Sequence, residues 1–299
     1  MLAAIVNPGY IIGFLTNMVI FALLGLSLNI IIGYIGYLNL GHVGFWAIGA
    51  YTYTLLLMNG TNYFVALLAG GVAAGISGLL LGIPTLKLKS HYIAIASLGF
   101  TYIVYSLVIN LNDLTRGPLG IPGIPRPVIF GIDFSGDLAY LILSIIIVSI
   151  SCLIIYILLR SPWGRILETI REDEIASKSL GKNIFKYKIQ AFILSAFFAG
   201  IAGGIFASFH EYIGGPGAFF LPQLLFILSV VMMGGAGSFW GSIVGAAALM
   251  TMYEAVRFLP IEATLVGPTQ QASFALVLIL IMIIHPRGIM GRKIKTFQK

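Results

Sequence analysis

Long apolar runs separated by short polar breaks make up most of the chain. Most of these runs hold about 20 residues, the length that an α-helix needs to cross the roughly 30 Å hydrocarbon layer of a membrane. We therefore predict an all-α, polytopic integral membrane bundle of eight or nine transmembrane helices, forming one domain over residues 1–299. The predicted spans are residues 10–32, 35–58, 63–83, 91–110, 138–159, 189–209, 221–233 with its flanks, 240–256 and 272–284.

Composition supports this class. The chain is 59% hydrophobic and 9% charged, with a mean hydropathy of +1.02, whereas about a quarter of the residues in a soluble domain are charged. The net charge of +7 lies at the ends of apolar runs, which favours a topological signal over nucleic-acid binding. Cys152 is a single cysteine and no Cys/His cluster accompanies it, so we expect no disulfide, metal or cofactor.

Residues 160–188 differ from the rest of the chain because they carry eleven of its 17 basic and 10 acidic side chains. Ser161-Pro162 is a typical helix start and Gly181 a typical helix end, so we predict one amphipathic helix between them. Within it, Glu174 and Lys178 are spaced to form an ion pair. Two interpretations remain open. The stretch is either a solvated loop that orients its neighbouring spans, or a coupling helix that docks on a soluble partner.

Two glycine-rich segments, residues 33–51 and 234–241, fall within apolar runs. Such segments indicate either close helix packing or an interrupted helix that lines a transport path. On the second interpretation, the predicted path residues are Asn39, Gly41, His42, Gly235 and Ser238. For His42 we favour a packing role over proton transfer, because no carboxylate occurs in the first 112 residues.

Charge placement predicts the topology. Residues 111–137 hold four prolines and five glycines without a positive excess, so they form an external loop, while residues 160–188 and the basic tail at Arg292, Lys293, Lys295 and Lys299 are cytoplasmic. Nine spans put the N-terminus outside; if residues 33–51 re-enter without crossing, eight spans put it inside. The N-terminus lacks the basic region of a cleaved signal peptide, so we expect it to remain in the mature protein.

The source of energy is inferred from missing motifs. The predicted spans hold no ionisable residue near their centres, although secondary transporters usually need one, and the chain has no GxxxxGK[ST] phosphate loop. It also shows no nucleophile and base set and no paired carboxylates, so we expect no catalytic site. These features favour a permease driven by a separate ATPase, with a stand-alone secondary transporter or channel as the alternative.

The series Ser161-x-x-Gly164-Arg165 and Ile170-Arg171-Glu172-Asp173-Glu174-x-Ala176-x-x-x-Leu180-Gly181 resembles the cytoplasmic loop of branched-chain amino-acid ABC importer permeases, the M-type subunit particularly. The resemblance implies a fold of that permease type in a prokaryotic cytoplasmic membrane. The residues it implies for ATPase coupling are Gly164, Arg165, Arg171, Glu172, Asp173, Glu174, Ala176 and Gly181.

The same resemblance implies partners and a substrate. The implied partners are a second homologous permease, two cytoplasmic ATP-binding subunits, an external substrate-binding protein and the lipid bilayer, with no nucleic acid. Branched-chain amino acids are the implied substrate, while related permeases serve urea, amides or other amino acids. The chain departs from the family at Tyr102 and Tyr105, where members often carry an acid and a base, so substrate roles are not transferred to these positions.

Overall fold

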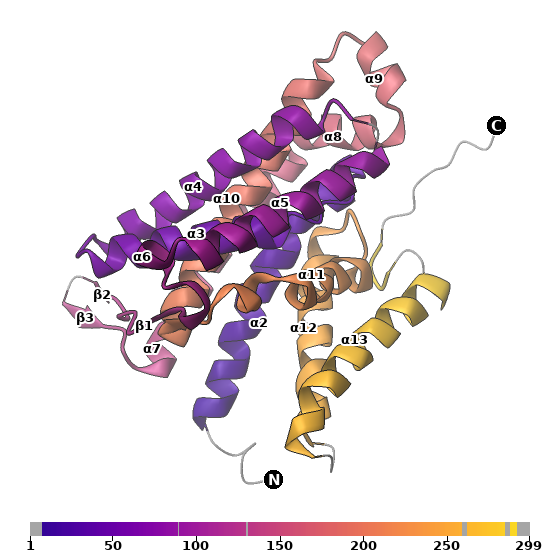
Figure 1. The fold of residues 1–299 in the computed structure, drawn as a ribbon. Helices are drawn as coiled ribbons and strands as arrows, with labels where there is room; N and C mark the ends of the chain where they lie inside the picture. Colours follow the sequence, from indigo (N-terminus) through magenta and orange to yellow (C-terminus); the bar gives the residue numbers. More distant parts are fainter. Residues whose placement is uncertain (1–7, 89, 130, 259–261, 285–287, 292–299) are drawn as a thin grey trace.

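The computed structural model describes residues 8–88, 90–129, 131–258, 262–284 and 288–291, and it is a bundle of long helices (Figure 1). Eight segments of this described chain are long and apolar enough to cross a membrane, and α3, at 17 residues, is slightly shorter. This confirms the predicted all-α bundle. The long helices are α2 (Pro8–Asn29), α3 (His42–Met58), α4 (Tyr63–Thr85), α5 (Ser90–Asn110), α7 (Asp137–Arg160), α10 (Ile184–His210), α11 (Leu221–Gly234), α12 (Phe239–Ala255) and α13 (Ala263–Ile284).

The bundle has two contrasting ends. The charged end carries the short helices α8 (Pro162–Glu172) and α9 (Glu174–Ser179), and it is where α2, α4 and α11 finish (Figure 1). The loop end carries α6 (Asn112–Thr115), the 3-10 turns Gly117–Leu119 and Pro216–Phe219, and the strands β1 (Ile121–Pro122), β2 (Val128–Ile129), β3 (Ile132–Asp133) and β4 (Tyr212–Ile213). Strand β1 pairs antiparallel with β4, and β2 with β3.

A helix break follows α2. The helix continues through a π-helical turn, Ile30–Ile35, and stops at Gly36, whose φ of 85° is left-handed. The predicted spans 10–32 and 35–58 are therefore corrected at this break, because the first helix continues to Ile35 and the second begins at His42. Residues 36–41 are non-helical, and their backbone finds side-chain partners: the Leu40 N–H donates to Ser97 Oγ at 2.9 Å, and the Leu40 carbonyl accepts from Thr101 Oγ1 at 2.8 Å. These α5 hydroxyls allow the chain to leave a helix inside an apolar bundle.

Helix α3 then crosses the remaining depth to the loop end, where the Tyr51 ring meets the Phe219 ring with centroids 6.1 Å apart. It packs closely on α10, because a Cβ on Gly49 would lie 2.2 Å from Gly200 Cα. Small-residue packing is thus confirmed for the later part of residues 33–51. With α3, the described residues contain nine long helices, and whether α3 crosses the membrane stays a prediction.

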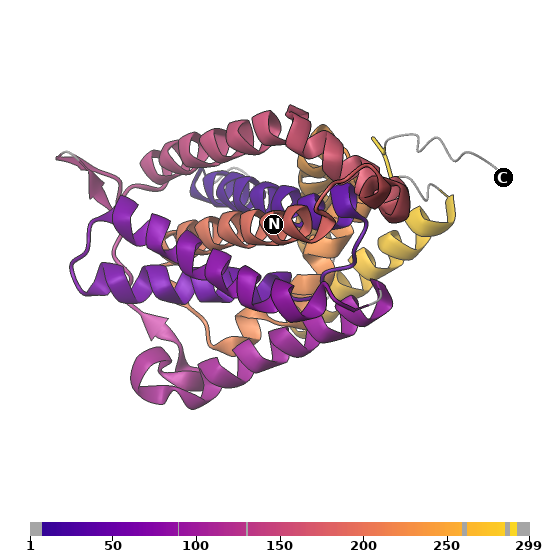
Figure 2. The same cartoon turned by 90° about the horizontal axis from the view of Figure 1, so that it is seen from above.

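Two outward faces are apolar. On α4, Leu68, Val72, Ile76 and Leu80 follow one another at four-residue spacing and are each at least half exposed. Four-residue spacing puts them on one helix face, which suits contact with lipid or with another helix. Helix α13 has the least buried apolar window of the eight segments, 11%, and lies at one side of the bundle (Figures 1 and 2).

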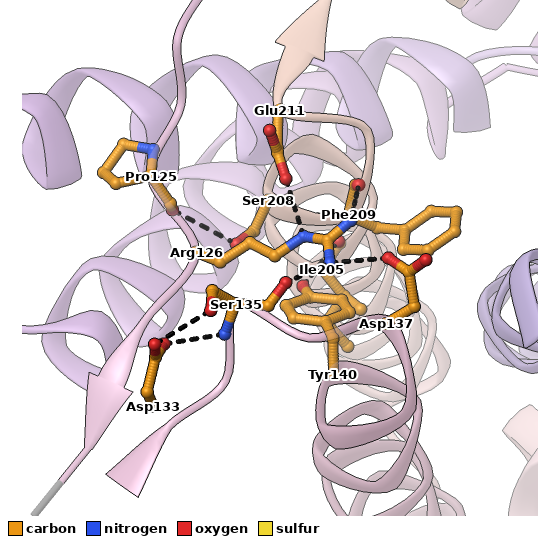
Figure 3. Close-up of polar contacts among 10 residues, drawn as sticks. All are labelled: Pro125, Arg126, Asp133, Ser135, Asp137, Tyr140, Ile205, Ser208, Phe209 and Glu211. Atoms are coloured by element: carbon orange, nitrogen blue, oxygen red, sulfur yellow. Dashed lines mark hydrogen bonds and ion pairs between the residues drawn. The ribbon is translucent and has the colours of Figure 1, made fainter. Parts of the chain in front are cut away.

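At the loop end, Arg126 anchors residues 126–137 to the bundle (Figure 3). Its guanidinium donates to the Ser135 carbonyl and to Asp137 Oδ1, at 2.6 and 2.7 Å, and forms an ion pair with Glu211 at 2.9 Å. Beside this cluster, Asp133 accepts from the Ser135 backbone and hydroxyl, which holds the pKa of its carboxyl below its ordinary value. The described part of the predicted loop, residues 111–137, is thus held to this end of the bundle by the contacts of Arg126.

The last span is longer than predicted, because α13 begins at Ala263 and contains Pro268. After it, the Ile289 N–H donates to the Met233 carbonyl at 2.8 Å, so the chain beyond α13 returns to the end of α11. The predicted basic tail, Arg287 and Lys89 lie outside the described residues.

Candidate functional site

The charged segment forms two helices at the charged end. Ser161 caps α8, its hydroxyl accepting from the Trp163 N–H at 3.2 Å, and Gly181, with a φ of 74°, follows α9. Both predicted ends are therefore confirmed. The single helix predicted between them is wrong, because Asp173 is extended and its carboxylate accepts from the Ile175 and Ala176 N–H groups, each at 2.9 Å. Asp173 thereby ends α8 and caps α9, the role that Asp favours at a helix start.

Helix α8 lies against the bundle. Its Gly164, Leu167 and Ile170 are buried, and a Cβ on Gly164 would lie 2.0 Å from the Leu159 carbonyl oxygen of α7. Because any larger side chain would collide with backbone, Gly164 is a close-packing position. Of the other predicted coupling residues on α8, Arg165 and Glu172 are exposed.

Arg171 connects α8 to both glycine-rich segments. Its Nη1 donates to the Gly33 carbonyl in the π-helical turn after α2. A Cβ on Gly36 would lie 3.0 Å from its side chain, and one on Gly237 would lie 2.9 Å from its Nη1. Burial lowers the pKa of the guanidinium below its ordinary value, although nearby Glu168 and Glu172 oppose the shift. Arg171 is thus in direct contact with the two segments in which path residues are predicted.

Asn29 joins the same two segments from inside α2. Its Oδ1 accepts from the Gly237 N–H at 2.8 Å, and its Nδ2 donates to the Ser238 carbonyl at 2.9 Å and to Ser242 Oγ at 2.8 Å. The residue is completely buried. A buried side-chain amide whose hydrogen bonds are all formed holds its partners in one position, because breaking these bonds would leave buried polar groups unpaired. Asn29 therefore holds the α11 to α12 connection against the end of α2.

Glu174, at the start of α9, has long-range partners. Its Oε2 lies 2.7 Å from Lys188 Nζ in α10 and accepts from Tyr37 Oη at 3.0 Å. The predicted pairing of Glu174 with Lys178 is therefore replaced by Lys188. Burial alone would raise the pKa of the Glu174 carboxyl, but hydrogen bonds and charge from Lys188, Tyr37 and Lys178 hold it below its ordinary value. Burial and the bond to Glu174 raise the pKa of Tyr37.

An open hollow of about 560 Å³ lies where these groups meet. The first break is residues 36–41, and the second break is the non-helical connection 235–238 between α11 and α12. The hollow is lined by Ile32, Gly36 and Tyr37 at the first break, by Arg171 and Glu174 from the charged helices, and by Met232 and Ala236 at the second break. Both breaks and both charged helices therefore border one space.

Two large apolar side chains are exposed at α9, one near its start and one directly after its end, with exposed Lys178 between them. Ile175 is 79% and Leu180 is 76% exposed, and Ala176 between them is exposed as well. Large apolar side chains that project from a charged segment indicate an interaction surface when they lie together. Helix α9 thus offers Ile175, Ala176 and Leu180 outward while Glu174 holds its first turn to the bundle.

The predicted path residues form two groups. Asn39 and His42 are buried beside the first break; the Gly41 N–H donates to Asn39 Oδ1 at 2.9 Å, and His42 Nε2 contacts Ser27 Oγ at 3.0 Å. Gly235 and Ser238 lie at the second break, where Gly235 has a φ of 109° and Ser238 Oγ caps α12 by accepting from the Gly241 N–H at 3.1 Å. Their placement on a transport path stays a prediction.

Sequence reasoning missed several residues that organise the site. They are Asn29, Ser97 and Thr101, which partner the two breaks, and Tyr37 and Lys188, which hold Glu174. Their shared signal is a polar side chain in or beside an apolar run, which usually has a partner inside a membrane bundle. Within the described residues, no group of three or more His, Cys, Asp or Glu is placed to hold a metal ion.

Apolar helices of membrane-spanning length, two helix breaks and a charged helix in contact with both define a multi-pass transport permease. Residues 10–285 match the family described as the permease component of branched-chain amino acid transport systems. Because that match covers most of the chain, the protein belongs to this family.

Named relatives agree with this assignment. The chain is 36% identical over 301 aligned residues to the high-affinity branched-chain amino acid transport system permease protein LivM of Escherichia coli, covering 92% of this chain and 68% of the relative. It is 25% identical to the guanosine ABC transporter permease protein NupQ of Bacillus subtilis, covering 64% and 66%. The structure of PsaBC from Streptococcus pneumoniae in complex with Fab shares the fold, with a TM-score of 0.52, 15% identity and coverage of 96% and 97%.

Proposed function

We propose that this permease imports branched-chain amino acids across the cytoplasmic membrane, driven by ATP hydrolysis in partner subunits. The observation that carries the proposal is the contact of Arg171 with both helix breaks, on a segment whose next helix leaves Ile175 and Leu180 exposed. A partner that moves α9 would pull α8, and Arg171 would transmit that movement to the breaks. We take the substrate from the LivM relative. The assignment needs a particular relative, because the guanosine permease shows that relatives differ in what they carry.

The proposed assembly follows from the exposed surfaces. Two cytoplasmic ATP-binding subunits occupy the charged end, a second permease covers part of the apolar helix faces, and an external binding protein meets the loop end. The charged end is cytoplasmic because basic residues gather on the cytoplasmic side of membrane proteins. The chain after α13 meets the end of α11 at the charged end, where the Ile289 N–H donates to the Met233 carbonyl, and this contact supports a cytoplasmic C-terminus.

Transport by the reconstituted complex tests the function. The permease, its ATP-binding subunits and a binding protein are placed in liposomes, and leucine uptake is measured with ATP, with a non-hydrolysable analogue, and with a proton or sodium gradient alone. The proposal predicts uptake with ATP only. Uptake driven by a gradient without ATP would instead establish the secondary transporter.

Labelling of introduced cysteines tests the orientation. After Cys152→Ser, a cysteine at Lys182 should react only from the cytoplasm, and one at Leu119 only from outside. Both positions lie in described, exposed segments at opposite ends of the bundle. Labelling of position 182 in intact cells by a reagent that cannot cross the membrane would reverse the proposed topology.

A further inference from the structure

A second cavity, of about 390 Å³, opens at the loop end between α2, α10, α11, α12 and α13. We call it the outer cavity, because it faces outward in the proposed orientation. Its volume is within the usual range for small-molecule sites, about 300 to 1,000 Å³. It is separate from the hollow at the charged end, with which it shares no lining residue.

The polar side of the outer cavity carries one charge of each sign. Glu254 Oε1 lies 3.2 Å from Arg257 Nη1, and Glu254 Oε2 accepts from Tyr10 Oη at 2.8 Å. Arg257 is about half exposed, and its guanidinium has five N–H donors, so this contact leaves it free to bind another group. Both residues lie in the last part of the α12 segment that is predicted to cross the membrane.

A buried acceptor adds to this polar side. Gln223, in the first turn of α11, lines the outer cavity, and its buried Oε1 has no hydrogen-bond partner among the described residues. Leaving a buried acceptor without a donor destabilises a fold, so such an atom at a cavity wall indicates a donor that arrives with a ligand. An ammonium group has three N–H donors and no acceptor, which matches Gln223 Oε1 and a carboxylate oxygen of Glu254.

The floor of the outer cavity is apolar and aromatic. The Phe226 ring contacts Phe21 at 5.0 Å and Phe274 at 5.8 Å between centroids, both in edge-to-face geometry. Met250 and Phe206 complete the apolar lining. A ligand that fits this lining therefore combines a cationic and an anionic group with an apolar group.

We propose that the outer cavity is a substrate site of the permease itself, which takes one α-amino acid with an apolar side chain. Arg257 binds the α-carboxylate, Glu254 and Gln223 accept from the α-ammonium, and Phe226 with its neighbours contacts the side chain. This assignment rests on the proposed import of amino acids and names where the permease holds its substrate. A nucleoside carries neither the α-ammonium nor the α-carboxylate, so it leaves Glu254 and Arg257 without ligand partners.

Protection of a cysteine in the outer cavity tests the site directly. Gln271 lines the cavity, so Gln271→Cys in a Cys152→Ser background is modified with a thiol reagent in the assembled complex, in nanodiscs without binding protein. Leucine at twice its Kd should slow modification about threefold, because the free fraction of the site is 1/(1 + [L]/Kd). Leucinamide, which lacks the carboxylate, and 4-methylpentanoate, which lacks the ammonium, should slow it much less.

Matched variants separate the two charges from a general effect on the fold. Glu254→Gln and Arg257→Gln should each remove protection by leucine while the unprotected modification rate stays close to that of the parent. Glu262→Gln, at an exposed position of the same end, should retain protection, and a Leu119→Cys reporter outside the cavity should not be protected. A variant that modifies much faster in the absence of ligand has a loosened cavity, and Gln223→Glu then serves as a second test that should tighten leucine protection.

The outcomes distinguish this site from the proposed function. Equal protection by leucine, leucinamide and 4-methylpentanoate, protection by guanosine in place of leucine, or unchanged protection in Glu254→Gln and Arg257→Gln would each overturn the amino-acid site. If leucine uptake with ATP persists in the same complex, only the location of the substrate site is wrong. If protection is seen but uptake needs no ATP, the site stands and the proposed energy source fails.

Discussion

Helices α8 and α9 come from one continuous charged stretch, but they meet their surroundings in opposite ways. Helix α8 buries Gly164, Leu167 and Ile170 against the bundle and inserts Arg171 between the two helix breaks. Helix α9 is held mainly through Glu174 at its start and leaves Ile175 and Leu180 exposed. The difference supports the proposal that α8 acts as part of the permease and that α9 contacts a partner.

The largest expected effect comes from removing Arg171. Arg171→Ala deletes a charged hydrogen bond to the Gly33 carbonyl, a type of bond that contributes about 1.5 to 3 kcal/mol, and it disconnects α8 from both breaks. We expect leucine uptake to fall at least tenfold, on the order of 1.4 kcal/mol in coupling, while the complex still assembles. Uptake and ATP hydrolysis are measured together.

Arg165→Ala is the matched control for this change, because Arg165 lies on the same helix but is exposed. If both variants transport equally well, α8 does not act through Arg171 and the division between the two helices loses its basis.

Asn29→Ala acts on the same two breaks, and we expect it to reduce stability with a smaller effect on uptake than Arg171→Ala. The change removes the partner of the Gly237 N–H and of the Ser238 carbonyl, and an unsatisfied buried group costs about 1 to 3 kcal/mol. Thermal unfolding in nanodiscs measures the loss, with the exposed Asn110→Ala as control. Equal melting temperatures would mean that Asn29 does not hold the two breaks together.

Asp173 tests the boundary between the two helices. Asp173→Ala removes the cap of α9, and loss of such a cap costs about 0.5 to 2 kcal/mol. Because the cap is local, we expect faster amide exchange in residues 174–180 with unchanged exchange in α8. Simultaneous loosening of both helices would show that the stretch behaves as one unit.

The smallest expected effect is the pH dependence of the Glu174 contact. The pKa of this carboxyl is held below its ordinary value, so its contribution to stability is complete above that value, near 4.5, and is lost as the pH falls through the folded-state pKa. Glu174→Gln should therefore melt lower than the parent at neutral pH and equally at low pH. A difference between the two that grows on acidification would contradict the ion pair with Lys188.

The length and apolar composition of the runs were sufficient to predict the bundle, because a helix is the structure that satisfies its own backbone in an apolar run. The ends of the charged segment, at Ser161 and Gly181, were also readable from local residues. The break at Asp173 was not, because helical pairings such as Glu174 with Lys178 favoured a continuous helix. Only the fold shows that the Glu174 carboxylate binds Lys188 and Tyr37 instead of Lys178.

The site itself was predicted in parts. The glycine-rich segments and Arg171 were identified, but their contact depends on two stretches about 200 residues apart in sequence, which no local pattern reports. Asn29, Ser97 and Thr101 were missed because each is a single polar residue in an apolar run. Their roles come from the backbone groups they satisfy in another element.

Retention of the ATP-binding subunit by a changed α9 tests the central claim most directly. Ile175→Asp with Leu180→Asp replaces the two exposed apolar side chains, while Leu119→Asp makes the same type of change at the loop end, where Leu119 is 80% exposed. The account predicts that the double variant reaches the membrane, loses the ATP-binding subunit on purification and no longer takes up leucine, whereas Leu119→Asp keeps the subunit. Retention of the subunit with normal uptake by the double variant would contradict it.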